Sequence, residues 1–154
     1  MDCRFCELLL QKNNDTLILP LKYGKLFLNI NQCFNGRVMY VLNKHYNDIT
    51  EIEPDEYCHI AKEIINISKA IKDIFSPDLV NVASLGNYVQ HAHWHIIPRY
   101  KNDSNWGSPP WPHGEKILSQ EELKLKSQFI REQLIKKEYF KTLDLTSDSG
   151  RASK

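Results

Sequence analysis

Apolar residues recur with two different periods along the chain, and these periods predict its secondary structure. Between Pro54 and Phe75 they recur at three- and four-residue steps, which predicts an amphipathic helix. Ser119 and Glu122 have the spacing of a capping box and predict a second helix that runs to about Phe140. Short apolar runs bounded by turn residues predict five strands, at 16–21, 25–30, 37–42, 79–85 and 91–97.

This order of elements indicates the class of the fold. Three strands, a helix, two strands and a helix are typical of a compact α+β domain around an antiparallel sheet. We expect residues 1–141 to form the domain, and the small polar residues of 142–154 predict a disordered tail. Between the last strand and the last helix, the loop 99–118 is rich in Trp and Pro. Its tryptophans either cover a ligand or close the core, and we expect them in the core.

Composition narrows the choice of partners. The 154 residues are 42% apolar and 25% charged, as in ordinary globular proteins, and the formal net charge is +1. No strong field attracts nucleic acid or an anionic membrane, although a single nucleotide needs only a few local donors. From residues 1–4 we expect no secretory signal at the N-terminus, and no apolar run approaches the roughly 20 residues of a membrane span. We therefore expect a cytoplasmic protein with reduced thiols that binds neither nucleic acid nor membrane.

Three histidines occupy alternate positions of the last predicted strand: His91, His93 and His95, called the histidine row below. Side chains alternate faces along a strand, so the three imidazoles share one face with a spacing of roughly 6.5–7 Å, and the residues between them point into the core. Imidazoles are nucleophiles, proton carriers and metal ligands near neutral pH. The histidine row therefore predicts a reactive site.

Two mechanisms fit the histidine row. In the first, two or three members bind a catalytic metal, which generally needs a further ligand, often a carboxylate. No acidic residue lies near this strand, and the next one along the chain is Asp103. In the second, the central histidine attacks phosphorus. The preceding turn at Gly86 and Asn87 supports that mechanism, because it offers backbone N–H groups and an amide for phosphate oxygens.

A Cys-x-x-Cys motif, Cys3 to Cys6, stands at the N-terminus. It is compatible with a redox pair, with half of a metal site or with coincidence. Zinc requires two further nitrogen or sulfur ligands, for which His45 and one member of the histidine row are the candidates. We expect Cys33 and Cys58 to be ordinary buried thiols.

The segment from His91 to Ile97 resembles the signature of the histidine triad (HIT) superfamily, His-φ-His-φ-His-φ-φ with φ apolar. The likeness extends over roughly residues 3–112. It includes the N-terminal Cys-x-x-Cys of the zinc-bearing branch, and the later Trp-Gly-x-Pro-Pro-Trp is similar to a bacterial-type subgroup.

The resemblance implies a five-stranded antiparallel sheet with two helices, often in a homodimer. It implies a nucleotide hydrolase or nucleotidyl transferase that acts at the α-phosphorus. His93 matches the nucleophile, which forms a nucleotidyl-histidine intermediate, and His95 matches the histidine beside the phosphoryl and leaving groups. The metal of the zinc-bearing branch would be structural, and its implied ligands are Cys3, Cys6, His45 and His91.

The resemblance also implies nucleotide contacts. Asn29 falls where relatives bind the ribose hydroxyls, and Gly86, Asn87 and Tyr88 fall where relatives bind the α-phosphate. Two departures stand out. Tyr88 replaces a small hydroxyl residue, and Arg37 stands where many relatives have histidine.

The leading hypothesis is therefore an enzyme that acts on a purine nucleotide conjugate, either a dinucleoside polyphosphate or a nucleoside phosphoramidate. In-line attack requires that one ring nitrogen of His93 is unprotonated and that the other donates to a backbone carbonyl. Two alternatives remain. One is a non-catalytic HIT-fold nucleotide-binding or interaction protein, and the other is a metal-dependent hydrolase that uses the histidine row.

Overall fold

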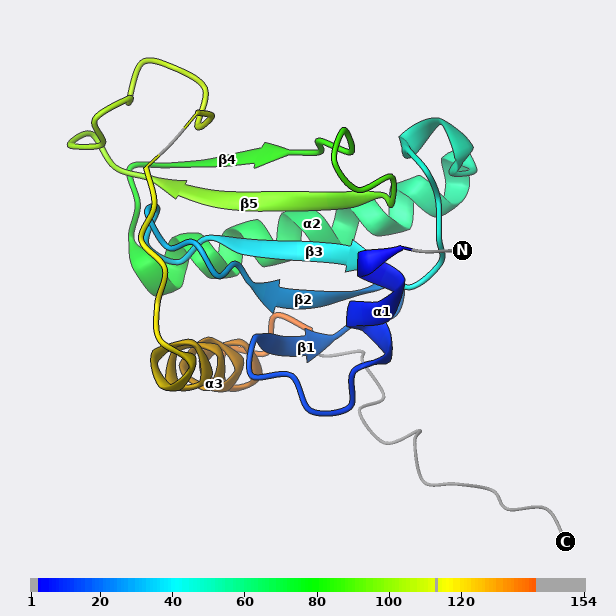
Figure 1. Ribbon diagram of the computed structural model, residues 1–154, viewed down its shortest axis with the longest axis horizontal. Coiled ribbons are helices and arrows are strands. Elements are labelled where there is room, and N and C mark those ends of the chain that lie inside the picture. Colours follow the sequence, from blue (N-terminus) through cyan, green and yellow to red (C-terminus); the bar gives the residue numbers. More distant parts are fainter. Residues whose placement is uncertain (1–2, 113, 141–154) are drawn as a thin grey trace, which may run out of the picture.

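The computed structural model describes residues 3–112 and 114–140. Within them, five strands form one antiparallel sheet in the order β1-β2-β3-β5-β4 (Figure 1). The strands are β1 (Leu17–Pro20), β2 (Gly24–Leu28), β3 (Val38–Leu42), β4 (Leu79–Ala83) and β5 (His93–Arg99). The predicted α+β class and antiparallel sheet are confirmed, and each predicted strand overlaps an observed one.

One boundary difference concerns the histidine row. The prediction started the last strand at His91, whereas β5 begins at His93. The backbone N–H of His91 donates to the carbonyl of Val89 at 2.9 Å, and that of Ala92 donates to the carbonyl of Tyr46 at 2.7 Å. One local and one long-range bond thus hold His91 in a bend just before the strand.

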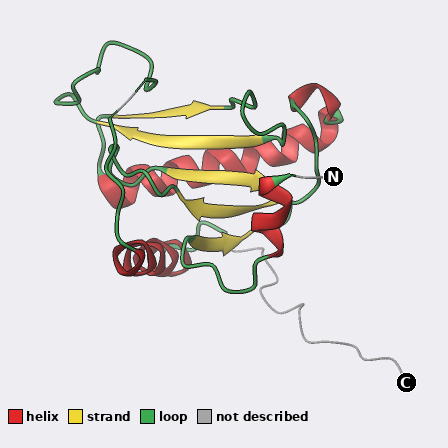
Figure 2. Ribbon diagram, viewed as in Figure 1, coloured by secondary structure: helices red, strands yellow, loops and turns green. Residues whose placement is uncertain are grey.

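The described residues form three α-helices, whereas the prediction contained two (Figure 2). α2 (Pro54–Phe75) has the predicted bounds. α3 (Gln120–Lys136) begins directly after Ser119, the N-cap of the predicted capping box, but ends before Phe140. The helix that sequence reasoning missed is α1 (Arg4–Leu10). Its seven residues are too short to display a helical period, and none of them is fully buried. The expected tail, 142–154, lies outside the described residues.

The hydrophobic core lies between the sheet and the two longer helices. α2 crosses the rear of the sheet in Figure 1, and α3 packs beside β1 and β2. Full burial of each isoleucine contributes about 1.5–3 kcal/mol, so this face supplies the main stabilisation. The core residues contributed by these elements include Leu26, Tyr40, Leu42, Ile60, Ile64, Ile67, Ile71, Trp94, Ile96, Leu123, Ile130 and Leu134. None of the helices in the described part of the chain is long and apolar enough to cross a membrane.

The opposite face of the sheet carries His93 and His95 of β5. α1 lies in front of it, near the end of β3 in Figure 1. The loop after β5 packs against the same face, where Trp111 contacts His95. Neither Trp106 nor Trp111 belongs to the core cluster of the described residues, so the expectation that these tryptophans close the core was wrong. The polar surroundings of this loop explain the difference, because Trp111 packs on an imidazole and a guanidinium.

Arg99, at the end of β5, anchors that loop. Its side chain is 2% exposed and stacks on the ring of Phe34, with 5.0 Å between the guanidinium carbon and the ring centroid. Its donors reach the carboxylate of Asp103 at 2.9 Å, the side-chain oxygen of Asn81 at 3.0 Å, and the carbonyls of Asn105 and Ser108 at 2.8 and 3.3 Å. One buried cation therefore ties the strand to the loop that carries Trp111.

We expect Arg99→Met to lower the free energy of unfolding by about 3–5 kcal/mol, because it leaves the largely buried Asp103 carboxylate without its cation. Urea unfolding measures the loss. Lys101→Met is the matched control, since Lys101 forms an exposed 3.9 Å pair with Asp78 and its removal should cost less than about 1 kcal/mol. Equal losses in the two variants would contradict the anchoring role of Arg99.

Candidate active site and metal centre

The histidine row gathers on the face of the sheet opposite α2. In the register of the sheet, His93 pairs with Val41 and His95 pairs with Met39. The rings of His93 and His95 meet edge-on with 5.1 Å between centroids. His91 lies before the strand but on the same side, because the ring of Phe5 contacts both it and His93. The predicted row is therefore present, although only two of its members belong to β5.

His91 belongs to a group of four possible metal ligands, Cys3, Cys6, His45 and His91. Their ligand atoms, sulfur or ring nitrogen, all lie within 4.8 Å of one another. Its Nδ1 lies 3.5 Å from Sγ of Cys3 and 3.6 Å from Sγ of Cys6. Sγ of Cys6 lies 3.3 Å from Nδ1 of His45. Bonds of about 2.3 Å to sulfur and about 2.0–2.1 Å to nitrogen give tetrahedral ligand separations of about 3.3–3.8 Å. The three separations given above lie in this range, and the donor set of two sulfurs and two nitrogens suits a four-coordinate zinc ion.

The second nitrogen of each histidine in this group supports that fit. Nε2 of His91 lies 2.8 Å from the carbonyl of Leu42, and Nε2 of His45 lies 3.4 Å from the side-chain oxygen of Asn47. A carbonyl only accepts, so Nε2 of His91 carries the proton and Nδ1 turns its lone pair to the cluster. Metal-binding histidines ordinarily have such outer partners, which fix the tautomer. Burial lowers the pKa of His91, which also favours the neutral ligand form.

His93 has the opposite tautomer. Its Nδ1 lies 2.7 Å from the backbone carbonyl of His91, so Nδ1 is the donor and Nε2 holds the lone pair. Burial lowers the pKa of His93, and the bond to the carbonyl acts against this shift. The ring is therefore neutral near pH 7 and is suited to act as a nucleophile. It is 4% exposed, and the ring of Phe5 packs edge-on against it at 4.7 Å.

His95 has a cationic neighbour. Nη2 of Arg37 lies 3.4 Å from Nδ1 of His95, and the guanidinium carbon lies 5.0 Å from the ring centroid of Trp111. The Trp111 ring in turn lies 5.3 Å from that of His95. Arg37 is 4% exposed, and this burial lowers the pKa of its guanidinium, which nonetheless stays charged at neutral pH.

A tight turn before β3 positions Arg37. The buried side chain of Gln32 accepts from the N–H of Gly36 at 3.0 Å and donates to the carbonyl of Arg37 at 2.8 Å. Gly36 has a φ of +88°, and a Cβ there would meet the ring of Phe75 at 2.6 Å. The Asn35-Gly36 turn signal thus has a steric basis.

Three residues touch the histidine row although the sequence predicted none of these contacts: Phe5, Arg37 and Trp111. Arg37 was visible in the sequence as a departure from the family pattern. Phe5 gave no signal, because α1 is too short to be recognised. Trp111 lies 16 residues beyond His95 in an irregular loop, and no periodic pattern connects the two.

The predicted nucleotide contacts lie in two places. Asn29 directly follows β2, and its backbone N–H donates to the carbonyl of Arg37 at 3.1 Å. Asn87 and Tyr88 border a pocket of about 460 Å³ that also touches Cys3 and His45. Tyr88 is fully exposed. The nearest atom to a Cβ built on Gly86 lies at 3.6 Å, so sterics do not demand glycine there. No described contact joins these side chains to His93.

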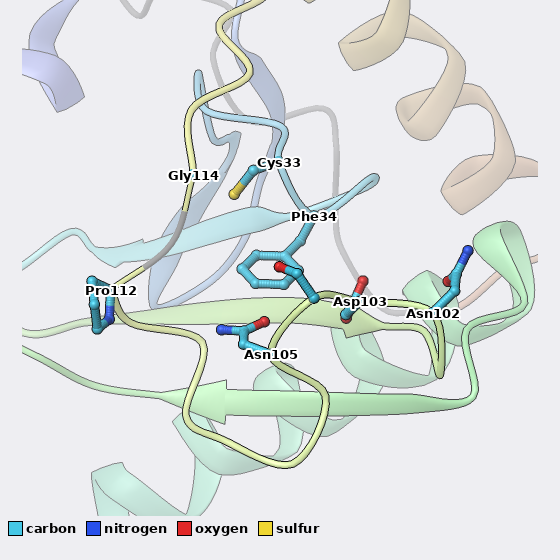
Figure 3. A pocket seen from close by; sticks show the side chains of 8 residues that line it. Cys33, Phe34, Asn102, Asp103, Asn105, Pro112 and Gly114 are labelled. Atoms are coloured by element: carbon cyan, nitrogen blue, oxygen red, sulfur yellow. The ribbon is translucent and has the colours of Figure 1, made fainter.

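A second pocket, of about 530 Å³, lies beside the loop after β5 (Figure 3). Its lining includes Cys33, Phe34, Asn105 and Pro112. Cys33 is half-buried there, with a thiol pKa that burial raises and the adjoining Arg37 guanidinium lowers. Cys58, which was also expected to be buried, is exposed on α2, so that expectation was wrong.

Comparison with known proteins identifies the family to which the chain belongs. The model of the HIT domain matches residues 11–102, more than half of the 154 residues, and the chain therefore belongs to the HIT family. The resemblance drawn from the histidine row is thereby confirmed at the level of the family.

Three relatives illustrate the range of this family. An uncharacterized HIT-like protein of Methanocaldococcus jannaschii is 29% identical over 106 residues, which cover 66% of this chain and 81% of that protein. The adenylylsulfatase HINT3 of Arabidopsis thaliana is 27% identical over 112 residues, covering 70% of this chain and 57% of that protein. A Zn-bound histidine triad family protein from Mycobacterium smegmatis has a TM-score of 0.67 at 20% identity, covering 88% of this chain and 97% of that one.

Proposed function

We propose that this protein is a nucleotide hydrolase or nucleotidyl transferase that attacks the α-phosphorus of a nucleotide conjugate, a dinucleoside polyphosphate or a nucleoside phosphoramidate. The observation that carries the proposal is the 2.7 Å bond from Nδ1 of His93 to the carbonyl of His91. Because Nδ1 carries the proton, Nε2 is unprotonated, and its lone pair is available to attack phosphorus. A relative named adenylylsulfatase, an activity on an adenylyl conjugate, supports the same class of substrate.

The reaction has two displacements. Nε2 of His93 forms a bond to the α-phosphorus, while the bond from phosphorus to the leaving group breaks and the leaving group takes the electron pair. Water, or another acceptor in a transferase, then attacks phosphorus and breaks the N–P bond. The proton on Nδ1 stays on His93 in both steps, and the bond to the His91 carbonyl stabilises the positive charge of the phosphorylated ring.

Access to the nucleophile requires movement of a neighbouring side chain. His93 is 4% exposed, and Phe5 lies against it from α1. A phosphoryl group reaches Nε2 only when the side chains that cover the ring move aside. Asn29, Gly86, Asn87 and Tyr88 are proposed as the nucleotide contacts once the substrate has entered.

His93→Ala should reduce kcat by a factor on the order of 10⁴ or more. Without the nucleophile, only substrate binding and electrostatic stabilisation of the transition state still accelerate the reaction. Turnover of a diadenosine polyphosphate and of an adenosine phosphoramidate measures the loss. Mass spectrometry of quenched wild-type protein should reveal a mononucleotide adduct that the variant lacks. His59→Ala is the control, since His59 is exposed on α2. Full turnover by the His93 variant would refute the mechanism.

The metal in this proposal is a structural zinc ion held by Cys3, Cys6, His45 and His91. Bound zinc supplies a cross-link between the N-terminus and the catalytic strand. The Zn-bound neighbour of the same fold supports the choice of metal. The ligand group found among the described residues includes His91 but neither His93 nor His95. This separation favours a nucleophilic mechanism over a metal-dependent hydrolase that uses the histidine row.

Cys6→Ser should reduce the zinc content, which atomic absorption measures, to well below one ion per chain. A metal present at a hundredfold excess over its dissociation constant contributes about 2.7 kcal/mol, so its loss should lower the melting temperature by roughly 5–11 °C. Cys58→Ser, at an exposed thiol, should change neither quantity. Full zinc occupancy in the Cys6 variant would exclude this ligand set.

The expected homodimer and cytoplasmic location stay predictions. β4 is an edge strand of the sheet formed by the described residues, and it exposes Leu79 and Val82. Its unpaired backbone groups suit strand pairing with a second copy. Light scattering should give a dimer for the wild type and a monomer for Val82→Lys, whereas Ile135→Lys, on the exposed face of α3, should stay dimeric. A monomeric wild type would rule out this assembly.

A further inference from the structure

The charge beside His95 bears on which substrates the site accepts. Arg37, His95 and Trp111 form one packed cluster next to the proposed nucleophile, with contacts of 3.4 Å from guanidinium to imidazole and 5.0 Å from guanidinium carbon to indole centroid. The cluster is largely closed to water, since Arg37 is 4% exposed. A cation held in such a place interacts with an approaching charge far more strongly than it would in water.

The contact with Arg37 fixes the protonation pattern of His95. A guanidinium only donates, so Nδ1 of His95 accepts and the proton of the neutral ring lies on Nε2. This tautomer can donate a hydrogen bond from Nε2, but transfer of that proton would leave an imidazolate. A second ring proton would place a positive charge directly against the guanidinium. His95 is therefore a hydrogen-bond donor and a poor source of a transferable proton.

The two substrate classes of the proposed function differ in whether the leaving group needs a proton. An amine leaving group must gain a proton before or during cleavage, because an amide anion is too basic to depart. A phosphate or polyphosphate oxygen departs with the electron pair as a stabilised anion and needs no proton. A preorganised cation and an N–H donor stabilise such a developing charge.

We propose that Arg37 is a specificity-determining residue that adapts this site to conjugates with an anionic phosphoryl leaving group, dinucleoside polyphosphates in preference to phosphoramidates. This inference rests on the proposed function of His93. In the first displacement the N–P bond forms, the bond from the α-phosphorus to the bridging oxygen breaks, and the electron pair stays on that oxygen beside Arg37 and Nε2–H of His95. In the second, the attacking water loses its proton to the solvent.

Room for a bulky leaving group exists beyond Arg37. The Arg37 guanidinium lowers the pKa of the Cys33 thiol, and Cys33 lines the 530 Å³ pocket. Pro112 of the same lining follows Trp111 in the chain. Figure 3 shows Cys33, Phe34 and Asn105 around this space. A leaving nucleoside polyphosphate that passes Arg37 therefore finds a pocket edged by amide and aromatic groups.

The test compares kcat/KM for a diadenosine polyphosphate and an adenosine phosphoramidate. We expect the wild type to prefer the polyphosphate. Arg37→Ala should lose about 10²–10³-fold on the polyphosphate, the effect of removing one preorganised donor to a developing anion, and much less on the phosphoramidate. Arg37→Lys keeps the charge and should lose less than Arg37→Ala. Arg131→Ala, at an exposed arginine of α3, should change neither substrate.

Each outcome separates this inference from the proposed function. A wild type that prefers the phosphoramidate overturns the inference without any variant, even if Arg37→Ala fails to fold. Equal losses on both substrates in folded Arg37→Ala also overturn it, while a His93 adduct leaves the proposed function standing. Absence of turnover and of adduct with both substrates overturns the proposed function and the inference together.

Discussion

The conformation of His91 is the constraint on which the rest of the site depends. Its ring donates from Nε2 to the carbonyl of Leu42 and turns Nδ1 to the cysteines, while its own carbonyl accepts from Nδ1 of His93. One residue therefore completes the candidate metal centre with its side chain and sets the tautomer of the proposed nucleophile with its backbone. Because β5 starts only at His93, the bend at His91 allows both roles at once. A regular strand would have left that carbonyl to a sheet partner.

Three adjacent imidazoles thus differ in their chemistry although they repeat in sequence. A carbonyl holds the proton of His91 on Nε2, another holds that of His93 on Nδ1, and a guanidinium leaves the proton of His95 on Nε2. Each assignment follows from a partner that can only accept or only donate. The proposed division into metal ligand, nucleophile and hydrogen-bond donor therefore follows from their neighbours and not from the histidine row itself.

Two buried arginines on this side of the sheet have different effects. Arg99 donates hydrogen bonds to the carboxylate of Asp103 and to loop carbonyls, so its charge is compensated and it holds the loop in place. Arg37 instead lies against an imidazole and an indole, beside the residue proposed to face the leaving group. The loop connects the two, because the segment anchored by Arg99 carries the Trp111 that packs on Arg37.

The α+β sheet, the bounds of α2, the capping box of α3 and the alternation of the histidine row could all be predicted from the sequence, because each is a local pattern with a fixed spacing. The sequence also indicated the four candidate metal ligands, through a family resemblance and not through spacing. Only the tertiary structure brought Phe5 and Trp111 onto the histidine row and directed the guanidinium of Arg37 at His95. Those contacts join a seven-residue helix, a turn and an irregular loop that are far apart in the chain, and short or irregular segments have no period from which packing can be read.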